Sequence, residues 1–315
     1  MYQTGELKQI RQRCFYAIGS GGITLTTASI VPWTIPKEAR FVSFFLIAPG
    51  GGGAGGATGA AGATRSGGGG GGPGATATAI YTARTLPETV YLILPRGGVG
   101  GNANTNGTAT TIALVTANPS SIATVPSNQF LHTTFGAIGL VAGGGGAAGT
   151  VSTVANCQLA SRALALNFNA GAAAGGAAGS PGASVTLQGL CTGGAGGGST
   201  VTTTPAAGGS INTANAVNIF ASNSATSPRL AQGGVTATPL DGAHGFDNIQ
   251  GSLPLGATAN GWYSIGGAGG ASIDNGTGGN GGNGGIGSGG GGGGAGTTGG
   301  RGGNGGPSFC MIEWW

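Results

Sequence analysis

The amino-acid sequence predicts a mostly β and irregular fold with little α-helix. In this fold, packed glycine-rich rods of the polyglycine-II type are flanked by β-strands and carry long surface loops. Three observations predict it. Glycine supplies 76 of the 315 residues, roughly three times its ordinary share. In two long tracts, glycine recurs at every third position. Short β-rich or strongly apolar segments stand near both ends of the chain.

The longest glycine tract covers residues 278–306, where every third residue from Gly278 to Gly305 is glycine. A polyproline-II helix has three residues per turn, so residues three apart line one edge of it. Glycine has no Cβ, and backbones therefore touch along that edge. Neighbouring rods then pair their N–H and C=O groups. The alternative is a flexible low-complexity linker, but nothing in a flexible linker requires glycine at every third position.

The in-phase glycines of the two tracts are therefore expected to be structural. They are Gly50, Gly53, Gly56, Gly59, Gly62, Gly68, Gly71, Gly74, Gly278, Gly281, Gly284, Gly287, Gly290, Gly293, Gly296, Gly299, Gly302 and Gly305.

Both tracts are expected to turn. Arg65 breaks the phase of the first tract, and residues 64–66 predict a turn between two rods. The second tract would reach roughly 85 Å if it were unbroken, which is too long for one compact domain. We therefore predict a bend at residues 296–298, where the Gly-Gly-X pattern is interrupted. Off-phase residues, Ile286 among them, are expected at the surface.

Strands are predicted where apolar and β-branched residues gather. Residues 41–48 predict a buried strand that runs into the first glycine tract, and residues 307–315 predict a strand after the second. Residues 75–83 and 89–95 predict two more, joined by a hairpin-like connection at 84–88. We expect residues 1–40 to form an N-terminal attachment segment. Residues 41–315 then form one glycine-rich domain, with loop insertions near 102–142, 150–170 and 199–265.

The bulk composition narrows the function classes. Only 6% of residues are charged and 39% are apolar, which does not fit a highly charged disordered chain. Five of the eleven basic residues lie in the first 40 positions, a pattern that indicates either an acidic partner or a solvated face. The four cysteines have no metal-ligand spacing, and we interpret them as small buried residues. No secretory signal or membrane-spanning run is expected.

The sequence offers little for catalysis. It has no phosphate-binding loop and no zinc-protease or serine-hydrolase motif. His244 has Asp241 and Asp247 three residues to either side, a pattern that fits a metal or acid–base site but fits a polar, turn-rich loop better. We expect no enzyme activity, no cofactor and no metal site.

Aromatic residues outside the predicted strands are better candidates for a binding site. Aromatic side chains on rigid supports give large contact area at low entropy cost. The alternative is that they fill small cores beneath their loops. The candidates are Phe130, His132, Phe135, His244, Phe246, Trp262 and Tyr263.

Four quoted segments carry a family resemblance. They are "ARFVSFFLIAPGGGGAGG", "GGGGGGPGATATAIYTA", "TVYLILPRGGVGGN" and, at the end, "GGRGGNGGPSFCMIEWW". This order resembles the glycine-rich domain of bacteriophage tail-fibre and adhesin proteins. The resemblance implies a virion surface protein, made in the host cytoplasm, in which polyglycine-II rods hold loops that determine receptor specificity.

The expected partners are other virion proteins, reached through the N-terminal segment, and a host surface glycan or protein. We also expect a homo-oligomer, with no nucleic acid and no membrane insertion. Two alternative functions remain. One is a decoration or head-fibre protein of the capsid or tail without receptor binding. The other is an ice-binding protein, which a row of small residues at Ala54, Ala57, Ala60 and Ala63 favours weakly.

Overall fold

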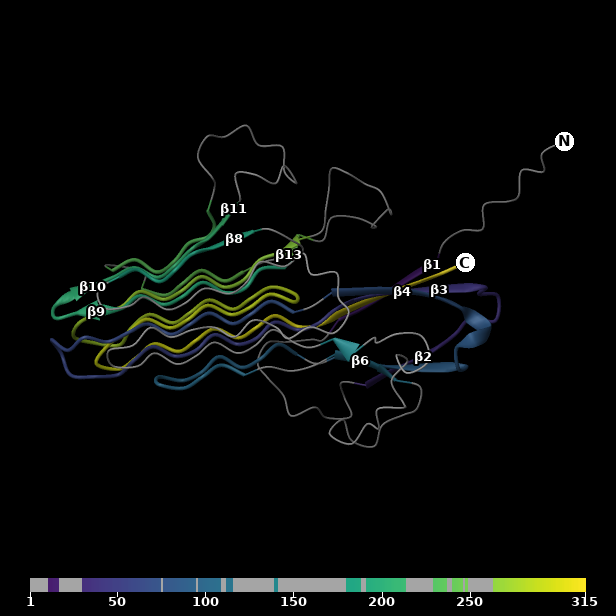
Figure 1. Ribbon diagram of the computed structural model, residues 1–315, viewed down its shortest axis with the longest axis horizontal. Coiled ribbons are helices and arrows are strands. Elements are labelled where there is room, and N and C mark those ends of the chain that lie inside the picture. Colours follow the sequence, from purple (N-terminus) through teal and green to yellow (C-terminus); the bar gives the residue numbers. More distant parts are fainter. Residues whose placement is uncertain are drawn as a thin grey trace.

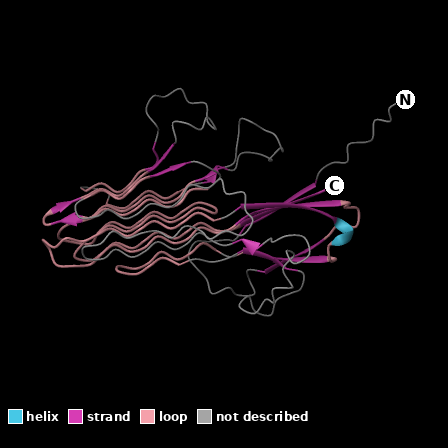
Figure 2. Cartoon of the chain, viewed as in Figure 1, coloured by secondary structure: helices cyan, strands magenta, loops and turns pink. Residues whose placement is uncertain are grey.

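The computed structural model describes residues 11–16, 30–74, 76–94, 96–108, 112–115, 139–140, 180–187, 191–213, 229–236, 240–245, 247–248 and 263–315. These residues form strands and irregular structure, with no α-helix among them. The molecule is elongated. Its longer strands gather at one end, and the glycine-rich loops run side by side from them to the other end (Figure 2).

Two four-stranded sheets form the strand end. The first has the antiparallel order β1 (Arg11–Tyr16), β15 (Phe309–Trp314), β3 (Phe41–Ile47) and β4 (Thr76–Thr82). The second has the order β2 (Ile30–Thr34), β5 (Thr89–Ile93), β6 (Ile112–Val115) and β7 (Gly139–Leu140). The first sheet therefore joins segments from both ends of the chain.

A single apolar core lies between these sheets. Alternate residues of β3, among them Phe44, point inward, because successive side chains of a strand face opposite sides. They meet Val90 and Leu92 of β5 and Trp33 of β2. Trp33 and Phe44 pack edge to face across the core, with ring centroids 6.0 Å apart. The sandwich holds the base of the glycine-rich part in place.

Most of the predicted strands are confirmed, but one connection is not. The segment predicted to be a hairpin between β4 and β5 begins with a 3-10 turn, η2 (Ala83–Thr85). It passes from one sheet to the other, because β4 pairs with β3 whereas β5 pairs with β2 and β6. β1 and β2, which lie within the stretch expected to form the attachment segment, are strands of the two sheets.

Extended glycine-rich segments continue directly from these strands (Figure 1). We call them the glycine segments and their hydrogen-bonded assembly the glycine array. β3 leads into segment 48–58, and segment 298–307 leads into β15. The principal glycine segments are 48–58, 65–74, 97–102, 191–200, 264–273, 277–285, 288–296 and 298–307.

Segment 288–296 lies at the centre of the array. Its N–H groups donate in rotation to three neighbours: those of residues 289, 290 and 291 bond Thr192, Gly51 and Gly282, at 2.8–3.0 Å. The same order repeats from residue 292 and again, to its first two neighbours, from residue 295. Its carbonyl groups accept from three further segments, 65–74, 264–273 and 298–307. Six segments therefore surround this one.

Close packing explains why this segment is almost pure glycine. A Cβ on Gly293 would overlap the carbonyl oxygen of Gly300, and one on Gly292 would overlap that of Gly68. A Cβ on Gly291 would overlap the carbonyl oxygen of Ala268. All three phases of the repeat therefore face backbone. In segment 48–58 the third phase holds Ala54 and Ala57, whose methyl groups are fully buried.

The chain reverses between segments at tight turns. The bend predicted at residues 296–298 is confirmed, because segments 288–296 and 298–307 hydrogen-bond to each other on either side of it. A second reversal of this tract occurs at Gly287, which has a φ of 67° that favours glycine. The turn predicted at 64–66 is wrong by a few residues: the N–H of Ala63 donates to the Ala60 carbonyl, and Gly62 has a φ of 75°.

One prediction about an individual side chain is also wrong. Ile286, expected at the surface, is buried with Ile47, Cys191, Phe309 and Met311 where the array meets the first sheet. Arg65, which breaks the glycine phase, is buried as well, with none of its surface accessible to solvent. The glycine period could not predict either burial, because it does not tell which edge of a segment meets a neighbour.

Short strands complete the structure along one side of the array. β9 (Thr200–Val201) and β10 (Thr204–Pro205) form a tight hairpin. β8 (Val185–Leu187), β11 (Ile211–Thr213) and β12 (Arg229–Ala231) form a small mixed sheet. β13 (Asp247–Asn248) pairs with β14 (Tyr263–Ser264). The stretch 199–265, expected as one insertion, thus contains several segments that belong to the array or its edge.

Candidate functional site

Three insertions leave the described structure and return to it at paired strands. Residues 116–138 lie between β6 and β7, where Ile112 pairs with Leu140. Residues 214–228 lie between β11 and β12, and residues 249–262 between β13 and β14. In each case the ladder is antiparallel, so the two ends of the insertion are held side by side. The array and the sandwich therefore fix where each insertion begins and ends.

Most of the candidate aromatic residues belong to these insertions or stand next to them. Phe130, His132, Phe135, Phe246 and Trp262 lie outside the described residues. The backbone of Tyr263 is placed in β14, opposite Asn248. Phe246 directly precedes β13 and Trp262 directly precedes β14 in the sequence.

His244 is the one candidate whose side chain is described. It is exposed, and its Nδ1 accepts the N–H of Asn283 at 2.9 Å. Asp241, three residues earlier, accepts the N–H of Asn280 through Oδ1 at 2.6 Å. These two side chains of segment 240–245 therefore accept hydrogen bonds from the backbone of the neighbouring segment 277–285. This arrangement supports the interpretation of "LDGAHGFDN" as a polar structural loop.

The same contacts continue across the surface of the array as two parallel ladders. The Oδ1 of Asn280 accepts the N–H of Arg301 at 2.9 Å, and the Oδ1 of Asn283 accepts that of Asn304 at 2.8 Å. Asn304 in turn accepts the N–H of Gly100 at 2.9 Å. Side-chain oxygens therefore replace the carbonyl acceptors that a further glycine segment would supply. We call these contacts the asparagine ladders.

The sequence carried a signal for these ladders that the glycine phase alone did not reveal. Asn280 and Asn283 are three residues apart, and Arg301 and Asn304 repeat that spacing. Polar residues that are three apart, like the glycines of the repeat, lie along one edge of a segment. They indicate that this edge lacks a backbone neighbour. Asparagine suits this edge because its amide oxygen reaches a neighbouring N–H.

The chemistry of the described residues is otherwise sparse. They contain no cluster of three or more His, Cys, Asp or Glu side chains arranged to hold a metal ion. No helix in the described part of the chain is long and apolar enough to cross a membrane. Cys191 and Cys310 are buried, as the sequence predicts for them, and neither forms a disulfide.

The alanine row that suggested ice binding is not a surface. Ala54 and Ala57 are fully buried inside the array. Ala60 and Ala63 belong to the turn at its far end, where the N–H of Ala63 bonds the carbonyl of Ala60. The four residues therefore do not present one flat, exposed face.

Comparison with known protein families covers about a third of the chain, in its N-terminal half. A family model described as a glycine-rich domain matches residues 25–134. The match includes strands β2 to β6 and the first glycine tract, so the glycine-rich domain begins within the sandwich. No curated protein that was compared matches the chain.

Proposed function

We propose that the glycine segments adopt the polyglycine-II conformation. The rotation of hydrogen bonds around segment 288–296 supports this: successive N–H groups turn to three different neighbours and return to the first after three residues. That is the symmetry of a helix with three residues per turn and no internal hydrogen bonds. An experimental structure should therefore give φ near −75° and ψ near 145°. Values typical of β-strands would contradict the assignment.

We propose that the protein is a bacteriophage virion surface protein of the tail-fibre adhesin type, which binds a host surface molecule through its insertions. The observation that carries the proposal is the closure of the insertions at antiparallel ladders on a hydrogen-bonded array. Such a support presents variable loops from fixed positions, which suits recognition. The resemblance of the four quoted segments to phage adhesin domains supports the same assignment.

Aromatic residues of the insertions are the proposed contacts with the host molecule. Substitution of Trp262 or Phe246 by Ala should lower the rate of host adsorption and leave particle assembly intact. The control is Arg301→Ala, because Arg301 is exposed on the glycine array and belongs neither to the insertions nor to the strand end. If both Trp262→Ala and Phe246→Ala particles adsorb like the unmodified particle, these residues are not the site.

A decoration or head-fibre protein is the second candidate, because a rigid hydrogen-bonded array also suits a purely structural component. Electron microscopy of the particle separates the two. A position at the tail tip favours the adhesin, whereas a regular position on the capsid shell favours decoration.

A further inference from the structure

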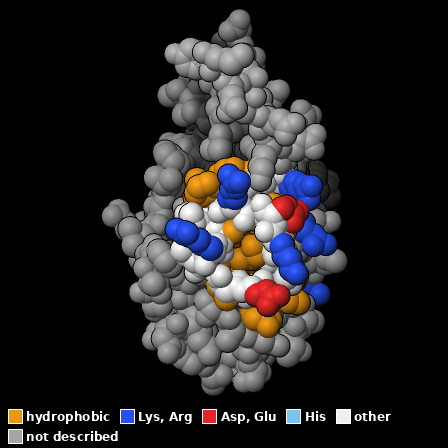
Figure 3. Space-filling view, turned by 90° about the vertical axis from the view of Figure 1, so that its right-hand side faces the viewer, with side chains coloured by type: hydrophobic (Ala, Val, Ile, Leu, Met, Phe, Trp, Pro, Cys, Tyr) orange, Lys and Arg blue, Asp and Glu red, His pale blue; other side chains and the backbone are white. Residues whose placement is uncertain are grey.

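The strand end of the molecule carries positive charge around an apolar centre (Figure 3). This surface, which we call the basic end, joins β1, the connection from β2 to β3, and the η2 turn. Two exposed carboxylates, Glu38 and Glu88, accompany its cations. The exposed cations are Arg11, Arg13, Lys37, Arg40 and Arg84.

Backbone hydrogen bonds hold the basic end in one arrangement. The N–H of Arg40 donates to the Trp315 carbonyl at 2.8 Å, and the N–H of Ala83 donates to the Arg40 carbonyl at 2.8 Å. The N–H of Phe41 also donates to the Trp315 carbonyl. Three stretches that are distant in the sequence therefore meet at this surface.

Much of the positive charge is not compensated locally. Arg11 pairs with Glu38 at 2.7 Å, but Lys37, Arg40 and Arg84 form no ion pair among the described residues. These three exposed cations share the surface with one exposed carboxylate outside the Arg11–Glu38 pair, that of Glu88. At the far end of the array, by contrast, Arg65 is buried and paired with Asp274. Positive charge is thus concentrated at one end of a long molecule.

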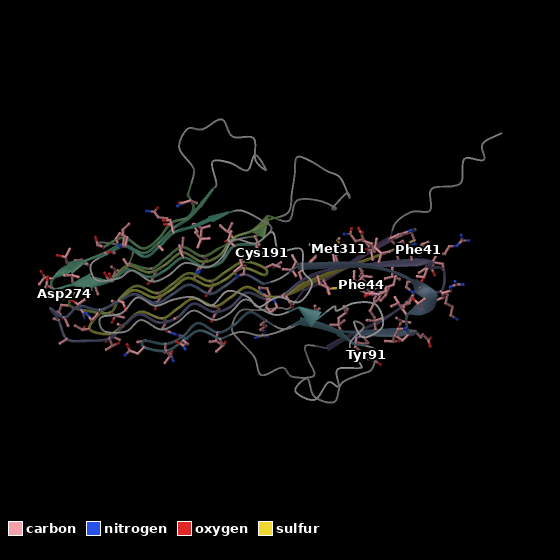
Figure 4. The ribbon with its side chains drawn as sticks, viewed as in Figure 1. Phe41, Phe44, Tyr91, Cys191, Asp274 and Met311 are labelled. Atoms are coloured by element: carbon pink, nitrogen blue, oxygen red, sulfur yellow. The ribbon has the colours of Figure 1, made fainter. Side chains whose placement is uncertain are left out.

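The same end exposes the two large apolar side chains that are most accessible among the described residues. Phe41 is 40% exposed and Ile80 is 57% exposed. The Phe41 ring stacks on that of Trp315, with centroids 5.8 Å apart. Phe41 and Ile80 lie on the same face of the sheet, because Ile80 pairs with Ser43, two residues beyond Phe41. Figure 4 shows Phe41 at the strand end, remote from Asp274.

We propose that the basic end is the surface through which this protein docks onto its particle, against a partner protein that presents acidic side chains around an apolar contact. The proposal rests on the proposed function as a virion protein. Apolar anchors at the centre of a patch supply most of the binding energy, and rim charges of opposite sign select the partner and speed association. Under this proposal, the attachment site is not the N-terminal segment of residues 1–40 alone. It is a folded surface to which both ends of the chain contribute.

A protein partner suits this surface better than an anionic membrane. Glu38 and Glu88 lie among the cations, and a carboxylate facing anionic lipid is repelled. A protein partner places groups of either sign opposite each charge.

Reconstitution tests the proposal. The probe is purified particles assembled without this protein, to which the purified full-length chain is added, with binding measured by co-sedimentation. The Arg40→Glu/Arg84→Glu double variant should lose at least about tenfold in affinity, because each change sets like charges against the partner. Phe41→Ala should also weaken binding. The affinity of the unmodified chain should fall as salt rises, and in 0.5 M NaCl it should approach that of the double variant.

Arg301→Glu is the matched control, since Arg301 is an exposed cation of the glycine array. It should bind like the unmodified chain, and thermal unfolding should show that every variant is folded. If the unmodified chain does not bind particles, the proposed function fails. If it binds and the folded double variant binds equally well, the basic end is not the docking surface. Co-sedimentation with phosphatidylglycerol vesicles that depends on Arg84, without an effect on particle binding, would also overturn the proposal.

Discussion

Arg65 and Asp274 form an ion pair at the far end of the glycine array, although they stand 209 residues apart in the sequence. Nη2 of Arg65 lies 3.0 Å from Oδ1 of Asp274 and also donates to its backbone carbonyl at 2.7 Å. Nη1 donates to the Gly59 carbonyl, and Nε donates to Oγ1 of Thr200. One buried guanidinium thus ties together three separate stretches of the chain.

Replacement of Arg65 by Met should destabilise the protein strongly. The substitution keeps much of the side-chain volume but removes the guanidinium from the Gly59 carbonyl and from the Asp274 carboxylate, which retains the N–H of Gly62. Removal of one partner of a buried ion pair costs about 3 kcal/mol or more. Urea unfolding should show this loss. Arg301→Met, which alters an exposed arginine, should change stability by less than about 0.5 kcal/mol. Equal stability of the two variants would contradict the role given to Arg65.

Gly293→Ala should be among the most damaging single changes in the array. Its Cβ would overlap the carbonyl oxygen of Gly300, and segment 288–296 has neighbours on all sides and so cannot shift away. We expect a loss of about 3 kcal/mol or more, measured by chemical unfolding. Ala295→Gly in the same segment is the control and should cost about 1 kcal/mol, mainly in chain entropy. A Gly293→Ala protein as stable as the control would show that the packing is looser than described.

The sequence predicted the local features of this fold better than their arrangement. The apolar run at 41–48 predicts β3 because a buried strand needs little else, and the interrupted pattern at 296–298 predicts a reversal. The burial of Arg65 and Ile286 was not predicted, for a shared reason. The glycine period tells which residues share an edge of a segment, but the neighbour on each edge comes from distant parts of the chain. Only the assembled array shows that Arg65 points inward.

The local features of the candidate site were likewise easier to predict from the sequence than its long-range contacts. The interpretation of Asp241 and His244 as members of a polar loop follows from their composition, but their partners Asn280 and Asn283 lie 39 residues away. Short-range patterns contain no information on that pairing. The basic end was missed as a surface because Arg40, Arg84 and Trp315 come together only through the pairing of β15, β3 and β4.

Asn283→Ala should expose one specific amide of the asparagine ladders. The change removes the side-chain oxygen that accepts the N–H of Asn304, while the glycine contacts nearby remain. Hydrogen exchange followed by mass spectrometry should show faster exchange in the peptide that contains Asn304, and stability should fall by about 1 kcal/mol. Asn280→Ala is the matched control: it should instead accelerate exchange at Arg301. Identical exchange patterns in both variants would contradict the ladder.

Glu313 should make stability depend on pH in the direction opposite to that of most carboxylates. It lies on β15 between Gln12 and Ser43, and burial raises the pKa of its carboxyl above the ordinary value of 4.5. The folded state therefore holds this proton more tightly than the unfolded state does. The resulting contribution to stability is fully present below pH 4.5 and is lost as the pH rises through the raised pKa.

Glu313→Gln should remove this dependence, because the amide resembles the protonated acid and does not ionise. The variant should therefore melt at a higher temperature than the unmodified protein at pH 7, and at nearly the same temperature at pH 4. Calorimetry at the two pH values measures the difference. Glu88→Gln is the control, since Glu88 is exposed and should not show this pattern. If Glu313→Gln instead lowers the melting temperature at pH 7, the ionised carboxylate stabilises the fold and burial does not dominate its environment.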